Sequence, residues 1–278
     1  MKITPATSQR FVVTILWLLT AITILVLLFI IVYILFHGIR NVTWSFLTES
    51  PRRMGRQGGV FPMIVGTIAV TGLAVLIAAP VGVLTTIFLT EYTRESKLTS
   101  VIRFGADCLA AIPSIIFGLF GFVFFVVVLG MGFSIISGAL TLAIMVLPTI
   151  IRTSEEAIRA VPAVYREVSY GLGSTRWQMV TRVVLKSALP GIGTGIVLSI
   201  GRCVSETAAV MLTAGSALRM PYSPLESSRT LSLHFYILSR EGISMQNAYA
   251  TASVLIITIL AINIIAYLLM RRLIAKVR

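Results

Sequence analysis

Two ionisable residues stand inside an otherwise apolar stretch that runs from about Pro190 to Ala214, and their chemistry suits an anion. Counted from Pro190 at 1.5 Å per residue, Arg202 lies roughly 18 Å along a helix, near the middle of a bilayer core of about 30 Å. A guanidinium at that depth costs about 2.5 to 3.5 kcal/mol, so it requires a protein interior or a watery path. Its planar donors fit an oxyanion, and Glu206, four residues later on the same helix face, can hold it when no anion is bound.

Ser199 falls on the same predicted face, so the three side chains form a polar stripe along one helix. We predict that Arg202, Glu206 and Ser199 line a substrate pathway. The alternative is an ion pair between Arg202 and Glu206 that only joins helices. His37 and His234 fall in separate predicted outer loops, where we expect them to be solvated or interfacial. Neither has ligand residues at metal-binding spacing, so we predict no catalytic site, metal site or cofactor.

A polar segment from Arg152 to Pro190 is the longest in the chain, and it carries a second candidate site. The segment is neither rich in glycine and serine nor uniform in charge, so we expect an ordered element rather than a linker. Within it, Gly173 can adopt a positive φ and end one short helix, while Ser174 or Thr175 can cap the next. The pattern predicts two short helices around a glycine turn.

Two apolar residues, Leu172 and Trp177, flank this turn. An exposed apolar residue beside a rigid turn is typical of a surface that docks a partner. The alternative for Trp177 is an anchor at the level of the lipid headgroups.

The composition indicates a membrane protein. Of 278 residues, 57% are hydrophobic and only 12% are charged, which leaves too little polar surface for a water-soluble globule. This excludes a soluble enzyme, a disordered chain, a secreted disulfide scaffold and a free nucleic-acid binder. The formal charge of +13 is then explained by the excess of Lys and Arg that orients a membrane protein, rather than by a surface that binds nucleic acid.

The uncharged runs predict six membrane-spanning helices and therefore an all-α polytopic bundle. One run is too long for a single span and must fold back, and its only turn signal is Gly130-Met131-Gly132. The runs are Phe11 to Phe36, Gln57 to Thr90, Cys108 to Ile151 (two helices), Pro190 to Ala214, and Ala248 to Met270.

Counting cations on alternate sides predicts the orientation. One side, which includes both termini, collects fifteen Lys and Arg residues, and the other collects seven. Cations accumulate in cytoplasmic loops, so both termini are predicted to be cytoplasmic, in the inner membrane. A basic cluster, Arg52, Arg53 and Arg56, lies on the predicted outer side against this rule. The long outer loop from Gly215 to Asn247 is predicted to be a surface loop or a contact for a soluble partner.

Several motifs in the chain resemble a known family of transporters. Glu167-Val168-Ser169, Gly173 and Ala188-Leu189-Pro190 resemble, in residue type and spacing, the EAA loop of type-1 ABC importer permeases. Val168-Ser169 replaces the two alanines of that loop, and Lys186 stands where its first proline often lies. Further motifs resemble phosphate-specific permeases, PstA type. They are Gly58-Gly59-Val60, Leu89-Thr90-Glu91-Tyr92, Ile112-Pro113-Ser114 and Ser205-Glu206-Thr207-Ala208-Ala209.

The resemblance implies a type-1 ABC importer permease of the MetI-like fold, with an N-terminal helix and outer loop over 1–60 and a transmembrane domain over 61–275. It implies a coupling loop at about 152–189 that seats in the ATPase, through Glu167, Leu172, Gly173, Ser174 and Trp177. It also implies a second permease subunit (PstC type), two ATPase subunits (PstB type) and an extracytoplasmic phosphate-binding protein (PstS type). The chain has no G-x-x-x-x-G-K-[ST] motif, so ATP hydrolysis is expected on the partner subunits.

Other functions remain open at this point. A type-1 permease for sulfate, molybdate or tungstate would carry the same oxyanion chemistry. An ion-coupled secondary transporter would show inverted repeats with matching broken helices, and none is evident in the sequence. An intramembrane hydrolase would need a histidine or metal ligands at bilayer depth, and neither histidine lies in a predicted span.

Overall fold

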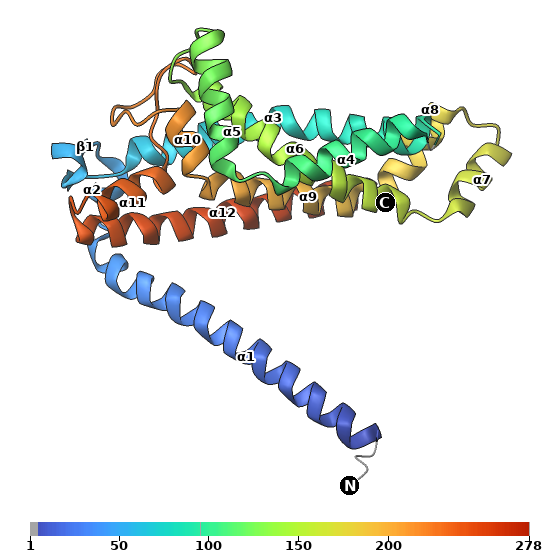
Figure 1. Ribbon diagram of the computed structural model, residues 1–278, viewed down its shortest axis with the longest axis horizontal. Helices are drawn as coiled ribbons and strands as arrows, with labels where there is room; N and C mark the ends of the chain where they lie inside the picture. The colour runs from blue at the N-terminus through green and yellow to red at the C-terminus, as the bar shows by residue number, and fades with distance from the viewer. Residues whose placement is uncertain (1–4, 95, 278) are drawn as a thin grey trace.

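The computed structural model describes residues 5–94 and 96–277 as a long helical bundle, with one helix that stands away from it (Figure 1). Its long helices are α1 (Pro5–Gly38), α3 (Phe61–Ile87), α4 (Lys97–Ala111), α6 (Ile135–Arg159), α9 (Leu185–Ser205) and α12 (Met245–Val277). Its short helices are α2 (Trp44–Thr48), α5 (Ser114–Gly121), α7 (Ala163–Gly171), α8 (Arg176–Met179), α10 (Ala208–Thr213) and α11 (Leu231–Arg240). A small antiparallel hairpin pairs β1 (Pro51–Arg52) with β2 (Gln57–Gly58).

Among the described residues, five helices are long and apolar enough to cross a membrane, and a bent pair makes up to six. The polytopic all-α prediction is confirmed. The bent pair joins α4 to α5 at an angle of 101°, so the predicted third span is broken rather than straight. The cause is local: Pro113 forces the preceding Ile112 into an extended conformation, with ψ 132°. The predicted turn is confirmed, because Gly130 and Gly132 both have positive φ values.

The centre of the bundle consists of α3, α6 and α9, which pack through small residues. Ala74 and Ala78 of α3 are buried in one core cluster with Leu142 and Val146 of α6. Gly191 and Gly195, one turn apart on α9, lie directly against α6, where any side chain in their place would collide with Ala157 or Thr153. Small residues at this spacing allow two helix backbones to approach closely in a membrane.

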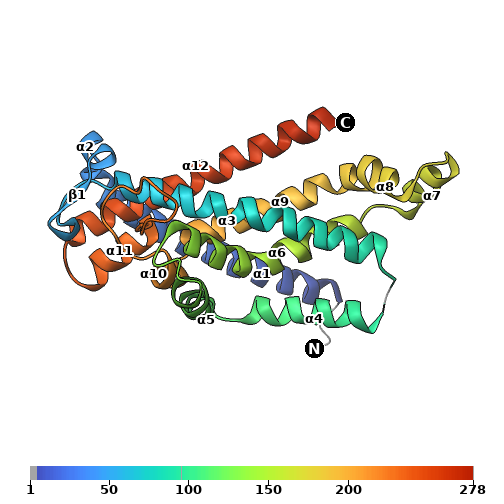
Figure 2. The same ribbon diagram turned by 90° about the horizontal axis from the view of Figure 1, so that it is seen from above.

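Helix α1 diverges from the bundle, and its most apolar stretch is wholly exposed, with 0% of it buried. It contacts α12 only near its own end, where Gly38 lies against Tyr249 and Ser253, and Ser253 donates a hydrogen bond to the Ile34 carbonyl. Figures 1 and 2 place the first turns of α1, the end of α12, and α7 with α8 at one end of the molecule. The segments that the charge count assigned to one side of the membrane therefore lie at one end of the molecule. Which end is cytoplasmic stays a prediction.

The predicted surface loop from Gly215 to Asn247 contains a packed helix. Thr230 caps α11 by accepting a hydrogen bond from the Leu233 amide, and the apolar face of α11 packs against α3 and α12. His234 is carried inward with this face, is 1% exposed, and lies beside the buried Arg229. The expectation of a solvated or interfacial His234 was therefore wrong. The residues flanking α11 are polar, but the helix packs its apolar face inward and buries His234 with it.

Acidification is expected to destabilise the protein through His234. Burial, and to a smaller extent the charge of Arg229, lower the pKa of His234 from 6.5 to about 3. Between these values the unfolded chain binds the extra proton, so the stability contributed by neutral His234 is constant above pH 6.5 and falls as pH drops toward 3. From pH 6.5 to 5 the loss is about 2 kcal/mol. Thermal unfolding in detergent at both pH values measures it. His234→Gln should lose this part of the pH dependence, and an unchanged dependence would contradict the assignment.

Candidate functional site

The predicted pathway helix is interrupted beside Arg202. Helix α9 ends at Ser205, Glu206 is extended with ψ 131°, and α10 begins at Ala208. The prediction of one continuous helix to Ala214 was therefore wrong. Ser205 donates its hydroxyl to the carbonyls of Gly201 and Arg202, a contact that bends helices.

Tertiary contacts hold this break open. Ser232 of α11 donates a 2.7 Å hydrogen bond to the Glu206 carbonyl, which has left the helix ladder. The Glu206 carboxylate accepts a hydrogen bond of 3.2 Å from the Ala209 amide at the start of α10. Glu206 thus acts as a capping group for α10, where a negative charge is favourable. These contacts satisfy one carbonyl and one amide that the break leaves without partners within the helix.

Arg202 lies on the open face of α9. Thr194, Leu198 and Ser205 are exposed, and Arg202, at the same helical spacing, is partly exposed among them. Within residues 5–94 and 96–277, the guanidinium forms no ion pair with Glu206 and no side-chain hydrogen bond. The predicted pairing of Arg202 with Glu206 on one helix face is thus corrected: the helix ends between them, and the carboxylate turns to α10. The guanidinium keeps its donors free for a ligand.

Ser199, one turn before Arg202 on α9, is buried, whereas Arg202 is partly exposed. Ser199 is 0% exposed, and its hydroxyl donates to the Gly195 carbonyl at 2.9 Å. The predicted polar stripe of Ser199, Arg202 and Glu206 therefore does not form. Serine satisfies its own hydroxyl within a helix, so its presence in an apolar span carries little information about a pathway.

The segment that joins α6 to α9 forms the predicted turn between two helices. Gly173 has φ +79°, and the Ser174 hydroxyl donates to the Ser169 carbonyl at 2.8 Å. Thr175, rather than Ser174, caps α8, and Gln178 completes a capping box. The expected turn is confirmed, and we call residues 163–179 the coupling segment.

The coupling segment presents its apolar residues to solvent. Leu172 is 84% exposed and Trp177 is 61% exposed, and Glu167 is exposed beside them. The segment projects beyond the end of the bundle (Figures 1 and 2). Exposed large apolar side chains at a rigid projecting turn are typical of a docking surface.

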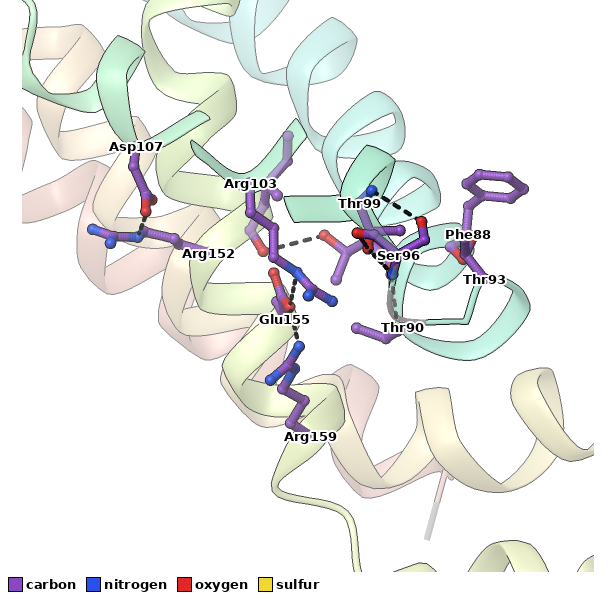
Figure 3. A network of polar contacts seen from close by, with 12 residues as sticks. Phe88, Thr90, Thr93, Ser96, Thr99, Arg103, Asp107, Arg152, Glu155 and Arg159 are labelled. Atoms are coloured by element: carbon purple, nitrogen blue, oxygen red, sulfur yellow. Dashed lines mark hydrogen bonds and ion pairs between the residues drawn. The ribbon is translucent and has the colours of Figure 1, made fainter. Parts of the chain in front are cut away.

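A polar cleft of about 220 Å³ lies between α4 and α6 at the same end of the bundle. Glu155 binds both Arg103 at 2.8 Å and Arg159 at 2.9 Å, while Arg152 binds Asp107 at 2.9 Å (Figure 3). These ion pairs tie α4 to α6. Among the described residues, no group of three His, Cys, Asp or Glu side chains is placed to hold a metal ion.

Comparison with known proteins adds a family to this geometry. Residues 78–278 match the family described as "Binding-protein-dependent transport system inner membrane component". The chain belongs to this family. The matched region contains Arg202, the coupling segment and the α4–α6 cleft, and it begins inside α3.

Relatives of this permease family match most of the chain. The "Probable ABC transporter permease protein YqgI" of Bacillus subtilis is 34% identical in an alignment that covers 90% of each chain. The "Phosphate transport system permease protein PstA" of Haemophilus influenzae is 31% identical over 88% of this chain and 89% of its own. PstA 1 of Mycobacterium tuberculosis H37Rv is 35% identical over 75% of this chain and 68% of its own.

Solved structures share the fold of this permease. A bacterial alginate ABC transporter matches 99% of both chains with a TM-score of 0.71 at 17% identity. The inward-facing MetNI methionine ABC transporter matches 79% of this chain and 94% of its own, with a TM-score of 0.60 at 21% identity. The predicted type-1 ABC importer permease fold is confirmed.

Sequence reasoning missed one buried contact of this permease, between the coupling segment and α3. Arg166 of α7 binds Glu91, which lies in the π-helical turn Phe88–Tyr92 that continues α3. The only sequence signal for this contact is that two charged residues of opposite sign border apolar spans, and many other pairs share that pattern.

Proposed function

We propose that this chain is the permease subunit of an ATP-driven importer of inorganic phosphate. The observation that carries the proposal is its similarity to phosphate transport permeases along most of its length. It is supported by a guanidinium on the open face of a membrane helix that has no side-chain partner among the described residues. Arg202 supplies fixed planar donors that match phosphate oxygens. The open face of α9 would line one half of the pathway, and a homologous second permease subunit would line the other.

The energy for transport comes from separate ATPase subunits. The sequence contains no Gly-Lys pair and therefore no P-loop. One of two ATPase subunits would dock on the coupling segment through Leu172, Gly173 and Trp177, with Glu167 and Ser174 beside them. An extracytoplasmic binding protein would deliver phosphate to the opposite end. In this arrangement both termini and the coupling segment are cytoplasmic, which agrees with the excess of cations on that side.

Transport follows an alternating-access scheme. ATP binding moves the docked coupling segment and shifts the bundle between two packings, one open to each side. Arg202 then meets phosphate only in the packing that exposes the open face of α9.

Phosphate is expected to be the oxyanion that stimulates ATP hydrolysis. The full complex, reconstituted in proteoliposomes with its binding protein, is assayed with phosphate, sulfate, molybdate and tungstate in turn. We expect severalfold stimulation with phosphate and none with the other three. Stimulation by sulfate or molybdate instead of phosphate would contradict the substrate assignment while leaving the permease assignment in place.

A further inference from the structure

Both arms of the coupling segment reach consecutive residues at the end of α3. From the first arm, Arg166 of α7 reaches the carboxylate of Glu91. From the second arm, the guanidinium of Arg176 in α8 lies 5.6 Å from the centre of the Tyr92 ring, within the range of a cation–π contact. The coupling segment therefore holds the end of α3 from two sides.

The contact between Arg166 and Glu91 has the geometry of a strong ion pair. Arg166 Nη2 lies 2.7 Å from Glu91 Oε1, and Nε lies 3.1 Å from the same oxygen and 3.4 Å from Oε2. The Glu91 side chain is 7% exposed and that of Arg166 is 23% exposed. Such a fork-shaped pair fixes orientation as well as distance.

The same guanidinium also binds the end of α6. Arg166 Nη1 donates to the Val161 carbonyl at 2.7 Å, and Nη2 donates to the Ile158 carbonyl at 3.0 Å. Carbonyls at the end of a helix lack partners within the helix and favour a cation. One side chain of α7 therefore joins α3, the end of α6 and α7 itself, although Glu91 and Arg166 are 75 residues apart in sequence.

An apolar cluster lies beside this junction. Ile87 of α3 and Ile158 of α6 are buried together with Met179 of α8, Val184 and Ala188. The second arm continues through Val180–Val184 directly into α9. The second arm is thus packed against α3 through this cluster, and the first arm reaches α3 through Arg166. The chain connects the two arms to α6 and α9.

We propose that Glu91 is the residue through which α3 receives the movement of the coupling segment. This inference rests on the proposed function, in which an ATPase displaces that segment. The chain itself transmits a displacement of the segment to α6 and α9, whereas the contacts between α3 and the segment that are found among the described residues are made by side chains. Apolar contacts allow sliding, whereas separating the two charges leaves the buried Glu91 carboxylate without its ion-pair partner. The ion pair therefore makes α3 move with α7. Such a link can carry energetic coupling between distant sites.

Glu91→Gln tests the proposal because it removes the charge and keeps the shape. In the reconstituted complex we expect the ATPase subunits to copurify as with the unmodified protein, and ATP hydrolysis without substrate to be unchanged. Stimulation of hydrolysis by phosphate-loaded binding protein, and phosphate uptake, should fall at least about 10-fold. Arg166→Lys keeps the charge without the fork and should give an intermediate loss. Glu156→Gln, an exposed carboxylate on α6 near the same end, is the matched control and should behave as the unmodified protein.

Two results would overturn the proposal. Equal stimulation in Glu91→Gln and the unmodified protein would show that α3 needs no ion pair to follow the segment. Loss of the ATPase from both the Glu91→Gln and Arg166→Lys complexes would show that the pair only builds the docking surface. A failure of the substrate assignment is distinguishable from both results. In that case another oxyanion stimulates the unmodified complex, and the same variants are compared with that oxyanion.

Discussion

Replacing Arg202 by alanine is expected to reduce phosphate uptake by roughly 10- to 150-fold while leaving the complex assembled. Arg202 has no ion pair or side-chain hydrogen bond within the part of the chain that the structure describes, so its removal leaves no buried group without a partner. A hydrogen bond to a charged group contributes about 1.5 to 3 kcal/mol, which corresponds to a loss of roughly 10- to 150-fold in rate if it acts in the transport step. Uptake of labelled phosphate into proteoliposomes measures the effect.

Two further variants define what Arg202 does. Arg202→Lys keeps the charge but not the planar fork, so uptake should be intermediate. Lys186→Ala removes an exposed cation from the same helix and should leave uptake unchanged. If Arg202→Ala instead dissociated the complex or lowered its melting temperature strongly, the residue would join helices rather than bind the substrate.

Replacing Gly173 by valine is expected to separate the ATPase subunits from the permease. Gly173 has φ +79°, a region that β-branched residues rarely adopt, and no neighbouring atom lies within 4 Å of the position where a Cβ would stand. The effect therefore comes from the backbone alone. A left-handed conformation costs an L-residue about 1 to 2 kcal/mol, and relaxing it would reorient Leu172 and Trp177.

Gly171 provides the matched control for this prediction. It also has open space around its Cβ position, but its φ is not positive. Recovery of the ATPase with affinity-purified permease should fall about 10-fold for Gly173→Val and remain near normal for Gly171→Val. Equal recovery from both variants would remove the turn from the docking surface.

The features that sequence predicted correctly depend on residues close together in the chain. The long apolar runs gave the spans, and Gly130, Gly132 and Gly173 gave turns because a positive φ is a property of single residues. Thr175 caps α8 through contacts three residues away. Each of these features is decided within one or two helical turns.

The errors concern contacts between distant segments. The break at Glu206 is stabilised by Ser232, 26 residues later, so the local pattern still favoured a continuous helix. His234 is buried because α11 packs against two other helices. The contact of Glu91 with Arg166 spans 75 residues, and charge pattern alone does not select it from the other possible pairs.

The glycine contacts between α9 and α6 limit which surfaces can open during transport. With no side chain at Gly191 or Gly195, the two backbones interlock with Ala157 and Thr153, and a slip of one helix by a single residue would force side chains into the opposing backbone. Helices α6 and α9 should consequently move as one rigid body. In the assembly proposed above, the aqueous passage would then widen outside these two helices, at the boundary with the second permease subunit.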